Sequence, residues 1–345
     1  MAHPGDPQPL AGGRVAAPFD IVRAAHAELV VTDLGRSREF YVDRLGLVVS
    51  EETHDALYLR GYEDRHHHCL VVRRGPLPLV DHLAFLVASD DDLDRAAAFY
   101  AARGCPVRRL EPDQERGQGR AVRVQDPLGF PVEYFASMER EDRLTQSFHL
   151  HRGGRIQRLD HFNLHVPDVQ TAFDQYYGDL GFRCSEYIEG DPPDTTLYAA
   201  WLFRKPDVHD VALTAGGGPR LHHVAFWTLD SLAITQLCDQ LGGAHAHHVI
   251  ERGPGRHGVG NAFYLYLRDP DGHRIELYTA DYWTGDPDLV PIRWSVSDDQ
   301  RRSFWGHPVP ERWYRESSLV ADLEGQPVLV TEPPVRERSV EILPS

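Results

Sequence analysis

Apolar and polar residues alternate in short runs along the chain, and these runs recur in a fixed order. Residues 26–47 read as a strand, a turn that begins with aspartate, and an amphipathic helix that ends before a glycine, and residues 160–182 repeat this design. Weaker copies occupy residues 80–104 and 222–243, and further short strands follow each copy, as at 261–278. Internal repetition is a strong signal of architecture. We therefore predict an α+β fold of four βαβββ units, paired into two curved open barrels.

The composition changes at three places along this repeat, and these changes suggest domain boundaries. Residues 1–20 are rich in Gly, Pro and Ala and are predicted to form an N-terminal arm. The two pairs of units then define an N-terminal domain over residues 21–150 and a C-terminal domain over 151–284. Residues 285–345 contain Pro and Trp but have no repeat partner. We predict that this tail covers a site in the C-terminal domain.

Candidate metal ligands lie on three separate strand-like runs of the second half: His161, His223 and Glu276. Side chains two residues apart share one face of a strand, so His161 and Asn163 are expected to point into the same pocket. Two neutral imidazoles and one carboxylate on one side of a metal leave the opposite coordination positions open, which is the arrangement of non-haem Fe(II) oxygenases. His222 is the neighbouring alternative to His223, and we expect its side chain to face the opposite way.

The sequence around these residues resembles the type I extradiol dioxygenases of the vicinal oxygen chelate superfamily. The resemblance extends from about residue 21 to residue 314, and its specific parts are RLDHFN, GPRLHHVAF, ERGPGRHGV, NAFYLY and SDDQRRSFW. It implies a non-catalytic first domain and ring cleavage of a catechol by O2 at Fe(II), and Mn(II) satisfies the same ligands. It further implies 3,4-dihydroxyphenylacetate as the substrate, 5-carboxymethyl-2-hydroxymuconate semialdehyde as the product, and a homotetramer.

Three further residues are candidates for catalysis. A neutral imidazole beside an open metal position can exchange a proton near neutral pH, and His209 stands in a suitable strand. The resemblance implies that this histidine is the acid/base residue. Tyr266 can donate a hydrogen bond to a substrate oxygen, and Asn163 can orient O2 or a substrate hydroxyl.

Arginine and histidine side chains in two separated segments predict a substrate with a carboxylate arm. Arginine binds a carboxylate through two parallel hydrogen bonds, and the glycine-punctuated loop at 251–259 and the tail both supply arginines. The resemblance assigns contacts with the substrate carboxylate to Arg252, His257 and Arg302. It assigns roles in shaping the pocket to Trp201, Arg301 and Trp313. We interpret Arg256 as structural.

The first half carries a second His/His/Glu set at the equivalent repeat positions, namely His26, His82 and Glu133. Its surroundings differ, because Arg123 stands at the position of Tyr266. We interpret this set as inherited ligands without catalysis, and the sequence leaves open whether they hold a metal.

Charge and composition exclude several classes of partner. The chain of 345 residues has a formal net charge of −16, which disfavours nucleic acid and acidic membranes, and only one lysine, Lys205. The sequence contains no apolar run long enough to span a bilayer, and its first residues lack the pattern of a secretion signal. The four cysteines show no CxxC spacing, so we expect a cytoplasmic protein without disulfides.

Other functions are compatible with the same fold. The chain can be an extradiol dioxygenase for another carboxylated catechol, or a glyoxalase-type isomerase. It can also be a binding protein that sequesters a small molecule. A proton-exchanging pair such as His209 and Tyr266 argues against sequestration, which needs no proton transfer.

Overall fold

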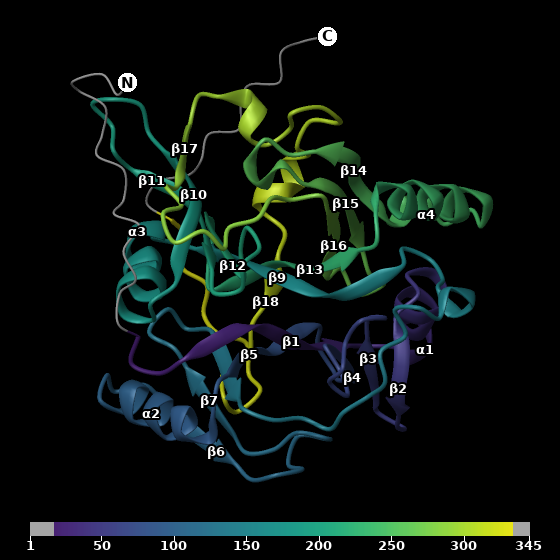
Figure 1. The fold of residues 1–345 in the computed structure, drawn as a ribbon, viewed down its shortest axis with the longest axis horizontal. Coiled ribbons are helices and arrows are strands. Elements are labelled where there is room, and N and C mark those ends of the chain that lie inside the picture. The colour runs from purple at the N-terminus through teal and green to yellow at the C-terminus, as the bar shows by residue number, and fades with distance from the viewer. Residues whose placement is uncertain (1–16, 334–345) are drawn as a thin grey trace.

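The structure is a computed structural model that describes residues 17–333. Most of the predicted N-terminal arm and the last twelve residues of the predicted tail therefore lie outside the described residues. Two open, curved sheets dominate the architecture. In Figure 1 the strands of the first half of the chain occupy the lower part of the molecule, and those of the second half occupy the upper part.

The N-terminal sheet has the strand order β2-β3-β4-β1-β5-β8-β7-β6. Its strands are β1 (Ile21–Val31), β2 (Val48–Glu52), β3 (Ala56–Arg60), β4 (Leu70–Arg74), β5 (Leu79–Val87), β6 (Val107–Leu110), β7 (Ala121–Gln125) and β8 (Pro131–Phe135). The helices between them are α1 (Leu34–Arg38), which runs on as the π-helical turn η1 (Glu39–Arg44), and α2 (Asp90–Ala101). Antiparallel pairing of β1 with β5 joins the two units of this half.

The C-terminal sheet repeats this plan in the order β14-β15-β16-β13-β9-β12-β11-β10 and is extended by β17. Its strands are β9 (Ile156–Val166), β10 (Arg183–Glu189), β11 (Leu197–Phe203), β12 (Val211–Ala215), β13 (Arg220–Thr228), β14 (Ile250–Arg256), β15 (Phe263–Arg268) and β16 (Arg274–Thr279). Its helices are α3 (Val169–Phe173), continued by η3 (Asp174–Asp179), and α4 (Ser231–Gly243). The predicted four βαβββ units are confirmed, each with one helix after its first strand.

The first helix of each half begins at the aspartate that the sequence places after the strand. Asp33 accepts hydrogen bonds from the backbone N–H groups of Gly35 and Arg36, and Asp168 does the same in the second half. A side-chain oxygen at this position satisfies N–H groups that have no partner inside the helix. An aspartate N-cap therefore starts both α1 and α3, soon after the ends of β1 and β9.

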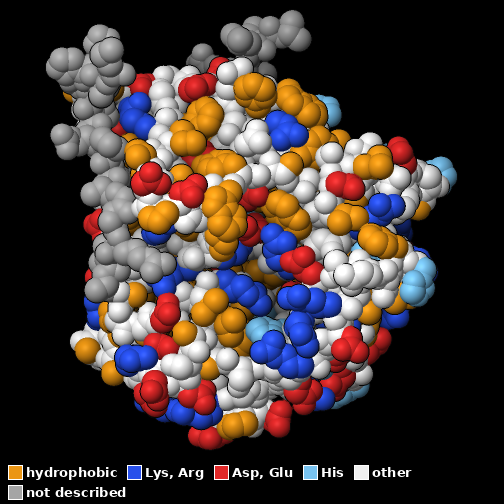
Figure 2. All heavy atoms as spheres, viewed as in Figure 1, with side chains coloured by type: hydrophobic (Ala, Val, Ile, Leu, Met, Phe, Trp, Pro, Cys, Tyr) orange, Lys and Arg blue, Asp and Glu red, His pale blue; other side chains and the backbone are white. Residues whose placement is uncertain are grey.

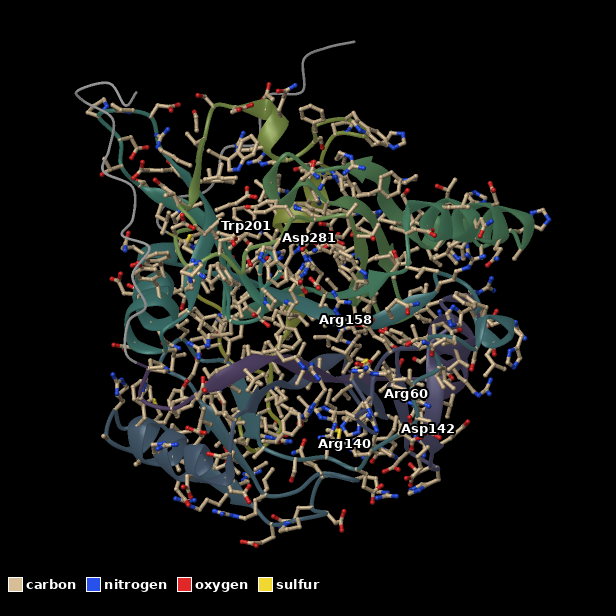
Figure 3. All side chains as sticks on the ribbon, viewed as in Figure 1. Arg60, Arg140, Asp142, Arg158, Trp201 and Asp281 are labelled. Atoms are coloured by element: carbon tan, nitrogen blue, oxygen red, sulfur yellow. The ribbon has the colours of Figure 1, made fainter. Side chains whose placement is uncertain are left out.

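The two sheets pack against each other through a shared apolar core. Phe85 of β5 and Phe162 of β9 are in edge-to-face contact, with ring centroids 5.9 Å apart. Arg158 lies at the boundary between the halves in Figure 3, where it pairs with Glu63 of the first half at 2.7 Å and Asp207 of the second at 3.2 Å. On the face shown in Figure 2, basic side chains gather at the level of this boundary.

The tail forms strands at two places before the described residues end. β17 (Ile292–Ser295) pairs in parallel with β10, and β18 (Ser318–Leu319) pairs antiparallel with β13. Just after β18, the N–H of Ala321 donates to the carbonyl oxygen of Val80 in the N-terminal sheet at 2.9 Å. The segment between β17 and β18 is therefore anchored at both ends on the C-terminal sheet, and the residues that follow β18 also contact the N-terminal sheet.

Candidate metal centre

Three neighbouring strands at the centre of the C-terminal sheet bring the predicted ligands together. His161 of β9 and Glu276 of β16 both lie beside Ala225 of β13 in the strand register, and His223 precedes Ala225 by two residues. Side chains in these positions point to one face of the sheet. All three ligand side chains are almost completely buried.

The ligand atoms of this triad are spaced as a metal ion requires. The Nε2 atoms of His161 and His223 are 3.3 Å apart, and Oε2 of Glu276 lies 3.1 Å and 2.9 Å from them, respectively. Adjacent ligands of an octahedral ion with bonds of about 2.1–2.2 Å are separated by about 3.0–3.1 Å, the bond length multiplied by √2. These residues therefore fit one face of a six-coordinate divalent ion.

Further side chains contact the Nδ1 atoms of the two histidine ligands. Nδ1 of His161 lies 2.7 Å from Oδ2 of Asp160, and Nδ1 of His223 lies 2.7 Å from Nδ1 of His222. Such partners fix the orientation of an imidazole and the nitrogen that carries its proton. The expectation that His222 faces away from His223 is wrong, because β13 has a bulge here. Two residues of β13 span one of β9 between the pairs Leu221–Leu164 and His223–Asn163.

The electrostatics of the triad favour the ligand forms that bind metals. Burial lowers the pKa of His223 to about 4, so its imidazole is neutral near pH 7. Burial opposes the ionised form of Glu276, but the nearby imidazoles outweigh it and hold its pKa well below the usual value. Burial also disfavours charge on His161, yet hydrogen bonds to Asp160 and Glu276 raise its pKa. At His161 these hydrogen bonds therefore favour the proton, which competes with a metal ion for the imidazole.

A cavity of about 800 Å³, measured to include space open to solvent, adjoins the three ligands. Its walls contain every catalytic and substrate-binding candidate named from the sequence: Asn163, Trp201, His209, Arg252, His257, Tyr266, Arg301, Arg302 and Trp313. Figure 3 labels Trp201 in the upper half of the molecule, on β11.

His209 lies directly against the triad. Its ring centroid is 3.8 Å from that of His161, and its Nδ1 is buried without a hydrogen-bond partner among residues 17–333. Burial lowers its pKa well below the usual value, so the imidazole is neutral. Lys205 fixes this segment, because its Nζ donates to the carbonyl oxygens of His209 and Asp160.

A chain of hydrogen bonds connects Tyr266 to the tail. Nδ1 of His257 lies 2.5 Å from the carbonyl oxygen of Arg302, and Nε2 lies 2.9 Å from the Tyr266 hydroxyl. A carbonyl oxygen only accepts, so Nδ1 carries the proton and the hydroxyl donates to Nε2. In this structure the Tyr266 hydroxyl is therefore directed at His257, which in turn fastens the tail.

Arg252 joins the same wall of the cavity. It donates to the carbonyl oxygen of Arg302 at 3.1 Å and to Ser303 Oγ at 2.6 Å, and its guanidinium lies 4.8 Å from the ring centre of Trp313. Its Nε is buried without a hydrogen-bond partner in the described part of the chain. Arg256, interpreted as structural, donates instead to the carbonyl oxygen of Asn261 at 2.6 Å.

Sequence reasoning missed several residues of the site. Thr214 lines the cavity and donates to Oδ1 of Asn163 at 2.8 Å, and His165 and Tyr314 line it as well. Tyr278 also lines the cavity, and its position two residues after Glu276 on one strand was a usable signal. Thr214 and Tyr314 carried no such signal, because their proximity depends on strand pairing and on the path of the tail.

Two comparisons with known proteins agree with this geometry. Residues 23–134 and 158–277 match the Glyoxalase/Bleomycin resistance protein/Dioxygenase superfamily. The manganese-dependent 2,3-dihydroxybiphenyl 1,2-dioxygenase of Geobacillus genomosp. 3 is 31% identical over 84% of this chain and 95% of its own length. The metapyrocatechase of Geobacillus stearothermophilus is 29% identical over 91% of this chain and 96% of its own.

Solved structures provide a third comparison. Homoprotocatechuate 2,3-dioxygenase from Brevibacterium fuscum, in its anaerobic complex with 3,4-dihydroxyphenylacetate, is 51% identical and superposes with a TM-score of 0.89. The match covers 92% of this chain and 98% of that one. Within residues 17–333, no helix has the length and apolar character needed to cross a membrane.

Proposed function

The chain belongs to the Glyoxalase/Bleomycin resistance protein/Dioxygenase superfamily, and we propose that it is an extradiol ring-cleaving dioxygenase acting on 3,4-dihydroxyphenylacetate. The reaction adds both atoms of O2 and gives 5-carboxymethyl-2-hydroxymuconate semialdehyde. The observation that carries this proposal is the His161–His223–Glu276 triad, with ligand atoms 2.9–3.3 Å apart at the wall of the cavity. The 51% identity to homoprotocatechuate 2,3-dioxygenase supports the choice of substrate.

The three residues of the triad would hold Fe(II), or Mn(II), which accepts the same ligands. When bound, the metal supplies coordination positions for the catechol oxygens and O2 and the electron transfer that ring cleavage needs. A relative that is 31% identical is described as manganese-dependent, which supports considering both metals. The protein itself contributes binding, orientation and proton transfer.

Proton transfer is the task we assign to His209. Its imidazole packs against that of His161 at 3.8 Å, so it stands beside any ligand that occupies the cavity next to the metal site. A neutral imidazole here can hold a hydrogen bond to oxygen and take a proton from a substrate hydroxyl. Asn163 and Tyr266 line the same cavity and are assigned to orient the substrate oxygens.

The arginines of the cavity wall are assigned to the carboxylate arm of the substrate. Arg252 has a buried Nε without a hydrogen-bond partner among the described residues, and Arg302 and His257 lie beside it. A buried donor without a partner is costly, and a carboxylate would satisfy it. Trp201, Arg301 and Trp313 shape the remaining walls in this proposal.

The domains and the assembly also belong to this proposal. The two sheets support division into a non-catalytic domain over residues 21–150 and a catalytic domain over 151–284, with 285–345 as the covering tail. All four cysteines are free thiols, which supports a reducing, cytoplasmic location. Resemblance to the extradiol dioxygenases supports a homotetramer.

A product assay tests the function directly. The metal-free protein is loaded with Fe(II) without oxygen, and air is then admitted with 3,4-dihydroxyphenylacetate, a longer-armed analogue or 4-methylcatechol. We expect a yellow ring-opened product, formed fastest with 3,4-dihydroxyphenylacetate. An isomerase or a binding protein would give no yellow product with any of these catechols. A faster reaction with another arm length would retain the chemistry and correct the substrate.

A further inference from the structure

The N-terminal sheet reproduces the positions of the metal ligands. His26 of β1 and Glu133 of β8 both lie beside Ala84 of β5, and His82 precedes Ala84 by two residues. This register is the one that places His161, Glu276 and His223 around Ala225 in the C-terminal sheet. The same bulge recurs as well, because the register of β5 shifts between His82 and Val80. The two sets are therefore equivalent in three dimensions as well as in sequence.

His209, which lies against the ligands of the C-terminal site, also has a counterpart in the N-terminal half. In the first half, the backbone N–H of Ala27 donates to the carbonyl oxygen of Cys69, just before β4, at 3.2 Å. In the second half, the backbone N–H of Phe162 donates to the carbonyl oxygen of Asp210, just before β12, at 3.0 Å. His68 therefore occupies the position of His209. Its ring centroid lies 5.0 Å from that of His26. This correspondence is not evident in the sequence, because the loops before β4 and β12 differ.

The ligand atoms of the N-terminal set are close enough to share one ion. The Nε2 atoms of His26 and His82 are 3.0 Å apart, and Oε1 of Glu133 lies 3.5 Å and 3.8 Å from them. Ligands of a tetrahedral ion with bonds of about 2.0–2.1 Å are separated by about 3.3–3.4 Å. The observed distances lie around this value, and all three side chains are at most 1% exposed.

The surroundings support the ligands as a metal site would require. Nδ1 of His82 lies 2.8 Å from Oδ2 of Asp81, which fixes the ring with Nε2 directed at the other two ligands. Nδ1 of His26 is buried without a hydrogen-bond partner among residues 17–333. Nε2 of His26 is the ring nitrogen directed at His82 and Glu133, so it is the atom that would bind the metal.

The charges around Arg123 leave room for a divalent cation. Its guanidinium contacts Asp81 at 2.9 Å, Glu115 at 2.7 Å and Glu133 at 2.6 Å. Three carboxylates therefore face one guanidinium, and Glu133 is the completely buried one, whereas Asp81 and Glu115 are partly exposed. Glu28, a further carboxylate close to these ligands, is already paired with Arg73 at 2.5 Å. Uncompensated buried charge is strongly unfavourable, and a divalent ion would balance it.

We propose that His26, His82 and Glu133 hold a divalent transition-metal ion of the zinc class in a four-coordinate site, with a water molecule as the fourth ligand. Arg123 binds the other oxygen of Glu133, and Gln118 donates to Oε1 of Glu133 at 2.7 Å. These two side chains cover the ligands on the side of β7. In the C-terminal half, Tyr266 of β15 occupies the position that corresponds to Arg123. The site is therefore structural and does not bind a catechol, and it is independent of the proposed function.

Metal stoichiometry of the full chain tests this proposal. Zn(II) or Co(II) is titrated into metal-free protein, and we expect two equivalents per chain. The double variant His161→Ala/His223→Ala should retain one equivalent without ring cleavage. His26→Ala should also retain one equivalent, but with ring cleavage preserved after Fe(II) loading. His54→Ala, an exposed histidine of the same half, serves as the control and should retain two.

Two further measurements keep the result interpretable. The Co(II) bound by His161→Ala/His223→Ala should show the intense visible absorption of four-coordinate cobalt, and Glu133→Gln serves if His26→Ala does not fold. A single equivalent in the wild type that disappears in His161→Ala/His223→Ala would overturn the proposal. The proposal would also be overturned if the wild type bound one equivalent of metal and only Arg123→Tyr bound a second. That result would show that the guanidinium of Arg123 takes the place of the metal in the wild type.

Discussion

Oδ2 of Asp160 lies 2.7 Å from Nδ1 of His161, and both side chains are almost entirely excluded from solvent. The carboxylate selects the tautomer in which Nε2 of His161 is directed at His223 and Glu276. The C-terminal metal site therefore depends on a residue that does not itself reach the metal.

Asp160→Asn should weaken binding of the catalytic metal by about 10–100-fold while leaving the fold intact, because such supporting carboxylates typically contribute this much. Competition against a chelator of known affinity measures the change. Asp288→Asn, at an exposed position, is the matched control and should bind as the wild type does. Unchanged affinity in Asp160→Asn would show that the hydrogen bond does not orient His161.

Alanine at His161, His223 or Glu276 should remove one equivalent of metal and abolish turnover, because each supplies one of three closely spaced ligand atoms. Metal analysis after gel filtration and an assay with saturating Fe(II) measure the two effects. Circular dichroism should show a folded chain. A variant that keeps the full metal content of the wild type would contradict the ligand assignment.

His209→Phe should bind Fe(II) and catechol normally and turn over about 10²–10⁴-fold more slowly, the usual contribution of a positioned acid/base group. Oxygen consumption should then exceed product formation, with the difference recovered as hydrogen peroxide. The exposed His149→Phe is a suitable comparison. Equal oxygen consumption and product formation at an undiminished rate would rule out His209 as the proton-transfer residue.

The carboxylate arm should give 3,4-dihydroxyphenylacetate an advantage over 4-methylcatechol of roughly two orders of magnitude in kcat/KM. One or two charge-assisted hydrogen bonds, each contributing about 1.5–3 kcal/mol, are sufficient for this preference. Arg302→Ala and His257→Ala should each reduce it.

The same variants also provide the decisive comparison. If Arg302→Ala and His257→Ala act through the carboxylate arm, their kcat/KM for 4-methylcatechol should remain close to that of the wild type. An equal loss on both substrates would place their effect on the metal site or on the fold. Absence of any preference in the wild type would favour a neutral catechol as the substrate.

Glu251→Gln should destabilise the chain by about 3–5 kcal/mol, because it leaves the guanidinium of Arg274 buried without its carboxylate. Both side chains are completely buried, with Arg274 Nε 2.6 Å from Oε2 of Glu251. Denaturant unfolding measures the free energy. Asp43→Asn, in an exposed pair with Arg38, should change it by less than about 1 kcal/mol.

The repeat pattern predicted the architecture, and together with the resemblance to the extradiol dioxygenases it predicted the principal site residues. His161, His223 and Glu276 could be found because strands alternate with a period of two and because corresponding positions recur in the two halves. The cavity also contains every other candidate residue named from the sequence for the C-terminal domain and the tail. The repeat determines the strand positions of those that lie within the sheet, whereas Arg301, Arg302 and Trp313 come from the tail, which has no repeat partner.

Other features depend on tertiary structure that the pattern does not encode. A bulge places His222 beside His223, and a bulge breaks the period-two rule. His68 and His209 correspond only through their hydrogen bonds to β1 and β9. The pairing of β17 with β10 and of β18 with β13 joins segments that are far apart in the sequence and have no repeat partner.

The attachment of the tail at two places limits how the cavity can open. Arg301, Arg302 and Trp313 belong to the span between β17 and β18, and strand pairing holds both ends of that span. It therefore behaves as a strap fastened on both sides and not as a free terminal flap. Fraying of the chain end cannot propagate into the cavity without first breaking β18 away from β13. Backbone hydrogen bonds between Arg256 of β14 and residues Phe304 and Trp305 hold the strap between these two ends as well, so this wall of the cavity is fixed at three places.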